Sequence, residues 1–142
     1  MESAFWDSSA LIPICVAQQA KTATRALLRK YERVVWWGTP VEMRGAFARL
    51  AKIGALSSNE QVQALVRMDQ LRRAWLEMEP TEQLRERAES LVERFQMKGA
   101  DSFQLAAAWM WCMGRPRHKP FISADLQLLA AAVQLGFNGI EG

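Results

Sequence analysis

The sequence predicts an α/β fold in which one parallel sheet is covered by helices on both faces. Short β-branched or aromatic runs alternate with longer amphipathic segments along the whole chain, and this alternation is typical of βαβ units. Right-handed crossovers between such units place helices on both faces of the sheet. The chain has 142 residues, half of them hydrophobic. It has no internal repeat and no linker, so we expect residues 1–142 to form one domain.

The first 37 residues are expected to form two strands with two helices between them. Asp7 directly follows the first strand. Pro13 falls in about the first turn of its helix, where a missing N–H costs little because the first helical N–H groups have no partner within the helix. The expected elements are a strand over residues 4–6, a helix over 10–16, a helix over 21–31 and a strand over 34–37.

The segment that follows has a strong helix start. Thr39 is expected as the N-cap, Pro40 stands at the first helical position, and Glu42 stands at the third. The rest of the chain continues the alternation. The further elements are helices over residues 39–54, 57–71, 81–95, 103–111 and 126–135, and strands over 75–78, 121–122 and 137–140.

Basic side chains concentrate in one part of the chain. Residues 21–55 carry eight Lys or Arg against two acidic residues, whereas the net charge of the whole chain is only +3. Such a segment fits a polyanionic partner such as RNA, but charge alone favours the alternative, a solvated helix face. Other observations must decide between the two interpretations.

No feature of the sequence indicates a membrane or secretion. There is no run of about 18 apolar residues, and the N-terminus lacks the basic segment of a signal peptide. Cys15 and Cys112 both have apolar neighbours, so we expect two buried free thiols rather than a disulfide or a metal pair. We expect a cytoplasmic protein that does not act at a membrane.

Four acidic residues stand where strands end or helices begin. Asp7 and Asp125 follow expected strands, and Glu42 and Asp101 lie in the first turns of helices. Ligands of open parallel sheets bind beyond the carboxyl ends of the strands, so we expect these side chains to reach one edge of the sheet. Four carboxylates gathered there would need a cation, because like charges raise one another's pKa. Mg²⁺ and Mn²⁺ prefer oxygen ligands and leave positions open for water and phosphate.

Each acid also has a purely structural interpretation. Glu42 has the position of a capping-box glutamate, and Asp101 with Gln104 fits a capping pair. Asp125 in a first helical turn is favourable for the helix dipole alone. Asp7 is the hardest to explain in this way, because a carboxylate directly after an apolar strand is costly unless something binds it.

Four segments resemble, in order, the motifs of the PIN-domain family. Residues 5–11 (FWDSSAL) look like the opening motif, in which an Asp and a Ser follow the first strand. Residues 39–43 (TPVEM) resemble the second motif, with Glu42 in the place of its acid. Residues 100–108 (ADSFQLAAA) resemble the third, an Asp-led helix. Residues 121–130 (FISADLQLLA) resemble the fourth, a strand followed by Ser/Thr-x-Asp and a helix.

The resemblance spans nearly the whole chain and carries expectations about fold and activity. It implies a PIN-like three-layer α/β/α sandwich with a parallel central sheet of about four to five strands. It also implies cleavage of single-stranded or looped RNA that depends on Mg²⁺ or Mn²⁺. By length and layout the chain is similar to the VapC toxins of toxin–antitoxin pairs. That subgroup implies a homodimer that a small antitoxin protein holds inactive.

The resemblance also suggests a role for each candidate residue. Asp7, Asp101 and Asp125 would hold the first metal ion, and Glu42 would complete the site or hold a second ion. Water would attack phosphorus in line and leave a 5′-phosphate. Ser9 and Ser123 are candidates to orient a carboxylate or a water, or to act as local caps. The candidates for phosphate contacts are Arg44, Arg115, Arg117 and Lys119.

Two features depart from the family pattern. Trp36, Trp37 and Gly38 stand where many members have a Ser shortly before the second acid, and Ser102 stands where Ala is common. Neither change removes a carboxylate. Bulky tryptophans bear on the openness of the site and on its substrate, and they could stack on bases.

Other chemistries fit the sequence less well. His118 is the only histidine, which excludes two-histidine ribonuclease chemistry. There is no Gly-x-Ser-x-Gly elbow and no Gly-rich phosphate loop. Two rival interpretations stay open: a catalytically silent PIN-like module that binds RNA or protein, and a metal-dependent DNA nuclease or phosphatase.

Overall fold

A computed structural model describes residues 1–142 as five strands and seven helices. The strands are β1 (Glu2–Trp6), β2 (Tyr31–Trp36), β3 (Leu76–Met78), β4 (Pro120–Ser123) and β5 (Asn138–Glu141). The helices are α1 (Ser8–Cys15), α2 (Thr22–Lys30), α3 (Thr39–Lys52), α4 (Ser58–Arg72), α5 (Glu82–Phe95), α6 (Gly99–Trp111) and α7 (Leu126–Leu135).

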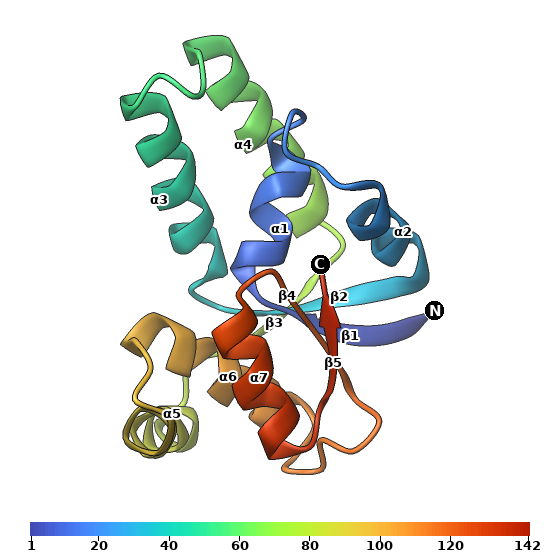
Figure 1. Ribbon diagram of the computed structural model, residues 1–142, viewed down its shortest axis with the longest axis vertical. Helices are drawn as coiled ribbons and strands as arrows, with labels where there is room; N and C mark the ends of the chain where they lie inside the picture. Colours follow the sequence, from blue (N-terminus) through green and yellow to red (C-terminus); the bar gives the residue numbers. More distant parts are fainter.

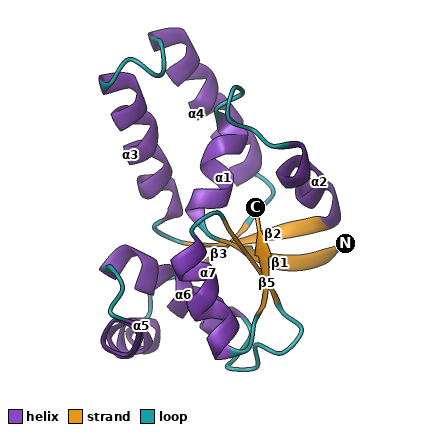
Figure 2. Ribbon diagram, in the orientation of Figure 1, coloured by secondary structure: helices purple, strands orange, loops and turns teal.

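All five strands are parallel and form one sheet in the order β3-β2-β1-β4-β5. Helices α1 to α4 lie on one face of the sheet, and α5 to α7 lie on the other (Figures 1 and 2). The predicted three-layer α/β/α sandwich with a parallel sheet is therefore confirmed. None of the helices has both the length and the apolar composition needed to cross a bilayer.

The strands supply both faces of the core through the alternation of their side chains. Phe5 packs into the cluster under α5, α6 and α7, whereas Ala4 and Trp6 pack into the cluster under the other helices. Val34 and Val35 divide between the two clusters in the same way. A strand that is buried on both faces reads as a continuous apolar run, which is the pattern expected for a central parallel strand.

The strand order reverses at the central strand, β1. From β1 the chain moves to β2 on one side, and β4 later pairs on the other side of β1. The Asp7 N–H donates to the Ile122 carbonyl at 3.0 Å, which fixes the end of β1 against β4. Such a reversal of strand order opens a ligand site at the carboxyl ends of the strands. Asp7 lies directly at this position.

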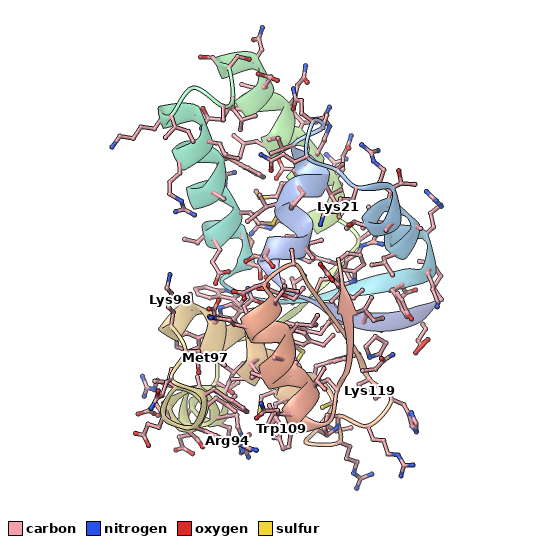
Figure 3. The ribbon with its side chains drawn as sticks, in the orientation of Figure 1. Lys21, Arg94, Met97, Lys98, Trp109 and Lys119 are labelled. Atoms are coloured by element: carbon pink, nitrogen blue, oxygen red, sulfur yellow. The ribbon has the colours of Figure 1, made fainter.

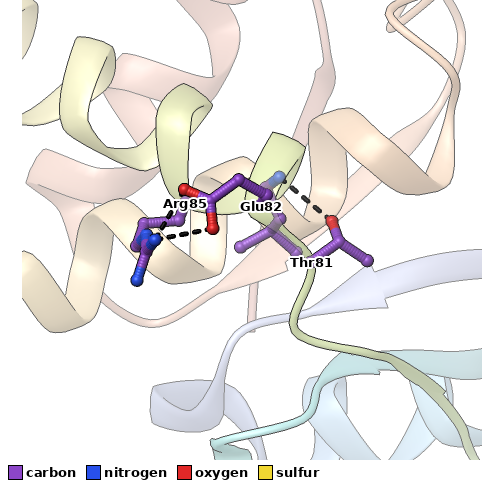
Figure 4. A network of polar contacts seen from close by, with 4 residues as sticks. Thr81, Glu82 and Arg85 are labelled. Atoms are coloured by element: carbon purple, nitrogen blue, oxygen red, sulfur yellow. Dashed lines mark hydrogen bonds and ion pairs between the residues drawn. The ribbon is translucent and has the colours of Figure 1, made fainter.

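Local capping signals set several helix ends. At α5 the Thr81 Oγ1 accepts from the Leu84 N–H at 3.1 Å, and Glu82 pairs with Arg85 at 2.6 Å (Figure 4). The ion pair is exposed and adds little stability. At the end of α7, Gly136 has φ 112°, a left-handed conformation that glycine adopts without strain.

The N-terminus of α4 provides a test of such local signals. Ser57 accepts from the Glu60 N–H at 3.1 Å, and the Glu60 carboxylate accepts from the Ser57 N–H at 2.9 Å. We expect Ser57→Ala to lower the free energy of unfolding by about 1 kcal/mol. Urea denaturation would measure this loss, with the exposed Ser58→Ala as the control. An equal stability for Ser57→Ala and wild type would contradict the capping role.

Several predicted boundaries were wrong. Helix α1 begins at Ser8 rather than at residue 10, so Pro13 lies near its C-terminal end and not in its first turn. Gly38, not Thr39, is the N-cap of α3. Tyr31 begins β2 instead of ending a helix, and α6 already begins at Gly99. Tyr31 belongs to β2 because it pairs with Glu2 of β1, and Gly38 is the N-cap because its carbonyl accepts from the Val41 and Glu42 N–H groups.

The two cysteines are free and buried, as predicted. Burial raises the pKa of the Cys15 thiol to about 12. A thiol with such a pKa carries almost no thiolate at neutral pH, so Cys15 is a core residue rather than a nucleophile.

Candidate functional site

The four predicted acids all lie toward the carboxyl edge of the sheet. Asp7 follows β1, and Asp125 follows β4 as the N-cap of α7. Glu42 and Asp101 stand in the first turns of α3 and α6. Their charges act on one another: Asp7 is coupled to Glu42 and Asp125, and Asp101 is coupled to Asp125 and Asp7. The fold therefore brings all four acids into one electrostatic group.

Asp7 is buried and held by two serines. Its side chain accepts from the Ser9 hydroxyl at 2.5 Å and from the Ser123 hydroxyl at 2.8 Å, both at Oδ2. The serines are themselves fixed, because Ser9 Oγ accepts from the Ala124 N–H and Ser123 Oγ accepts from the Asp125 N–H, each at 3.0 Å. Ser9 and Ser123 thus orient this carboxylate and tie the end of β1 to the β4–α7 turn.

Glu42 is held in a similar way from two other elements. Its Oε2 accepts from the Ser8 hydroxyl at 2.6 Å and from the Gln104 amide at 2.9 Å. The same amide nitrogen lies 3.2 Å from Thr39 Oγ1. Gln104 is buried, and its own oxygen has no partner. Glu42 therefore does not act as a capping-box residue, and Gln104 does not form a capping pair with Asp101.

The two buried acids share one feature. In Asp7 both side-chain donors meet Oδ2, and in Glu42 both meet Oε2. The second oxygen of each carboxylate accepts no hydrogen bond from the protein. Each side chain is thus anchored through one oxygen and presents the other, an arrangement that suits ligation of a cation.

Burial and mutual repulsion raise the proton affinity of three of these acids. Burial raises the pKa of Asp7 and of Glu42, and it raises the pKa of Asp101 as well. Neighbouring carboxylates raise all three further, while the serine and glutamine hydrogen bonds lower the pKa of Asp7 and Glu42. Buried, mutually repelling carboxylates are stabilised by a proton or by a cation.

Asp125 and Asp101 complete the group from the ends of helices. Asp125 Oδ1 accepts from the N–H groups of Gln127 and Leu128, at 3.0 and 3.2 Å. The capping interpretation is thus correct for one oxygen of Asp125 and leaves the other free. Asp101 is half-buried, and the Lys98 ammonium counteracts the rise of its pKa.

The donor set fits a divalent cation in its chemistry. All four groups are anionic oxygen donors, which Mg²⁺ and Mn²⁺ prefer. No three His, Cys, Asp or Glu side chains converge as a set that would hold an ion directly. Repulsion between the carboxylates opposes a closer approach, and a divalent ion would remove that repulsion.

The predicted phosphate contacts lie away from this group. Arg115, Arg117 and Lys119 belong to the loop before β4, at the edge of the sheet opposite Asp125. The Lys119 ammonium lies over the Trp111 ring, and Lys119 and Lys98 lie on opposite sides of α7 in the view of Figure 3. Arg44 is exposed and stands two positions after Glu42, so it points to a different face of α3.

Three residues of the group were not predicted to belong to it. Ser8 and Gln104 hold Glu42, and Lys98 is the basic side chain that lowers the pKa of Asp101. A signal existed only for Lys98, which stands three residues before Asp101 and just ahead of its helix. The contact of Ser8 depends on the packing of α1 against α3, and the contact of Gln104 depends on the packing of α6 against β2, after which α3 begins.

The two neighbouring tryptophans differ in their surroundings. Trp36 is buried and stacks on Phe103, with ring centroids 5.2 Å apart. Trp37 is 51% exposed. Trp36 is therefore a core residue, and only Trp37 offers a surface on which a base could stack.

The raised pKa values predict an unusual pH dependence for the metal-free protein. Because these carboxyls bind protons more tightly when folded than when unfolded, their contribution to stability is complete below the unfolded pKa and is lost as pH rises through the folded pKa. Asp7→Asn removes one such group. The stability of Asp7→Asn minus that of wild type should therefore increase as the pH rises above the ordinary range of a carboxyl group. Chemical denaturation in a chelator would measure it, and a constant difference would contradict the account.

A scan against protein-family models and a search of curated proteins found no match to this chain.

Proposed function

We propose that this protein is an endoribonuclease that hydrolyses RNA phosphodiester bonds with Mg²⁺ or Mn²⁺ bound at its carboxylate edge. The observation that carries the proposal is the buried Asp7, fixed by two serines and electrostatically coupled to Glu42 and Asp125. A fold rarely buries a carboxylate beside two others without a function, because the arrangement is destabilising in itself.

The sequence resemblance supports a more specific form of this proposal. The four motifs that resemble those of PIN domains contain Asp7, Glu42, Asp101 and Asp125, and the electrostatic coupling among these four acids supports the proposal. On the same resemblance we propose a VapC-like toxin that acts as a homodimer and is inhibited by a small antitoxin protein.

Each residue of the group has a role in this mechanism. Asp7, Asp101 and Asp125 would hold the ion, and Glu42 would complete the site. A bound divalent ion lowers the pKa of water and neutralises charge on the phosphoryl oxygens. Ser9 and Ser123 bind one oxygen of Asp7 and leave the other free for the ion. Ser8 and Gln104 do the same for Glu42. Holding the carboxylates in place before substrate binds reduces the reorganisation needed during the reaction.

A substitution of Gln104 tests the role of the side chains that hydrogen-bond to the proposed metal ligands. Gln104→Met keeps the size of the side chain but removes its donors to Glu42, so we expect Mn²⁺ affinity to fall by roughly 10–100-fold. Isothermal titration with Mn²⁺ would measure the change. The exposed Gln63→Met on α4 is the matched control. Equal Mn²⁺ affinity in Gln104→Met and wild type, with both folded, would show that Gln104 serves packing alone.

Two other functions are compatible with the same residues. A PIN-like module kept for binding RNA or protein would need no set of three metal ligands. A metal-dependent DNA nuclease or phosphatase would use the same acids and is separated from the proposal only by its substrate.

Cleavage assays would separate these functions. Purified protein, freed of any bound partner, would be incubated with total RNA, single-stranded DNA or a phosphomonoester, each with Mg²⁺, with Mn²⁺ or with chelator. The proposal predicts RNA cleavage that needs the ion and is lost in Asp101→Asn. Preference for DNA or for the monoester would replace the proposed substrate. Binding of RNA without cleavage of anything would favour the silent module.

A further inference from the structure

A hollow opens directly beside two of the carboxylates. It has a volume of about 590 Å³ and lies between the α5–α6 turn and α7. Asp101 and Asp125 form part of its wall. The hollow is therefore continuous with the carboxylate group and falls within the usual size of a small-ligand pocket.

The rest of its wall has a distinct chemistry. Beside the two acids, the polar groups are Lys98 and the amide side chains of Gln96, Gln127 and Gln134. Leu128 and nearby apolar side chains supply the remainder. Amides that donate and accept hydrogen bonds can read the edges of an unpaired base, and apolar side chains can cover its face.

Lys98 is the cation of this hollow. Its side chain is exposed, and it takes part in neither of the ion pairs of the protein. Its charge acts on Asp101, which places it within electrostatic reach of the carboxylate group. An unpaired ammonium at the rim of a site that cleaves phosphodiesters is suited to a flanking phosphate.

We propose that this hollow binds the nucleotide next to the cleaved phosphate of single-stranded RNA, with Lys98 on its phosphate and Gln127 and Gln134 at the edge of its base. The inference rests on the proposed nuclease function. A base in a duplex is paired and stacked and cannot turn into such a hollow. The hollow thus makes the protein select unpaired RNA and prefer certain bases beside the cut.

The test combines binding with cleavage. Binding of a fluorescein-labelled single-stranded RNA of mixed sequence would be followed by anisotropy in wild type, Lys98→Gln and Gln134→Leu, and each protein's cut sites would be mapped with Mn²⁺. We expect Lys98→Gln to weaken binding by about 5–10-fold and to reduce its salt dependence. Gln134→Leu should change the base composition beside the cut. Lys52→Gln and Gln70→Leu, on α3 and α4, are the matched controls.

The outcomes separate this inference from the proposed function. If wild type cleaves RNA and both hollow variants bind it equally well and cut the same sites, the inference is overturned while the nuclease function stands. If RNA binds in a way that depends on Lys98 but is not cut, the hollow is supported and the nuclease function fails. If wild type neither binds nor cuts RNA, both fail.

Discussion

Asp7→Asn should abolish RNA cleavage and at the same time stabilise the metal-free protein. The substitution keeps an oxygen that can accept from Ser9 and Ser123, but it removes the buried charge. We expect cleavage to fall by about 1,000-fold or more, because loss of a metal ligand removes several kcal/mol of transition-state stabilisation. We expect the free energy of unfolding in chelator to rise by about 0.5–2 kcal/mol, as at other sites where function opposes stability.

Two measurements on the same samples would check this prediction. Initial rates of RNA cleavage report the loss of activity, and urea denaturation in chelator reports the gain in stability. Asp69→Asn, an exposed acid on α4, is the control and should change neither. If Asp7→Asn were less stable than wild type in chelator, this would contradict the view that the buried charge of Asp7 lowers the stability of the metal-free protein.

Divalent ions should stabilise the wild-type protein strongly. An ion that binds only the folded carboxylate group adds about 2.7 kcal/mol when its concentration is 100 times the dissociation constant. For a domain of this size the melting temperature would rise by roughly 5–10 °C. Mn²⁺ and Mg²⁺ should act in this way, whereas Na⁺ at equal ionic strength should not, because the effect comes from ligation and not from screening.

Thermal melts of wild type and Asp101→Asn would measure this effect. The variant should lose most of the shift, since Asp101 is coupled to both Asp7 and Asp125. If both proteins melt at the same temperature with and without Mn²⁺, the carboxylates do not form a metal site, and a binding module becomes the better interpretation.

Features set by local signals could be predicted from the sequence. Helix α7 has the predicted bounds, because Asp125 caps its start and Gly136 adopts the left-handed conformation at its end. The position of Asp7 at the carboxyl edge also followed from the sequence, because a residue after a parallel strand has only one edge to reach.

Features set by packing could not be predicted. Gln104 seemed to belong with Asp101 in its own helix turn, but it bonds to Glu42, which is 62 positions away. Helices α6 and α3 cover opposite faces of the sheet, and the two side chains meet because α6 packs against β2, after which α3 begins. No periodicity of one helix encodes that contact.

The basic loop shows how closeness in sequence can mislead. Arg117 and Lys119 stand only a few residues before Asp125, yet strand β4 separates both of them from Asp125. A strand advances about 3.3 Å per residue, so four residues carry the chain from one edge of the sheet to the other. The cation that acts on the carboxylate group is Lys98, which lies at the end of the turn between α5 and α6.

The chemistry of the cut ends tests the central claim most directly. A single-stranded RNA labelled at each end in turn would be incubated with the purified protein and Mn²⁺, and the new ends would be identified. Hydrolysis by water at the carboxylate edge predicts cleavage that stops in chelator and leaves a 5′-phosphate and a 3′-hydroxyl. Cleavage that persists in chelator, or that leaves a 2′,3′-cyclic phosphate, would contradict the account, because the RNA's own 2′-hydroxyl would then be the nucleophile.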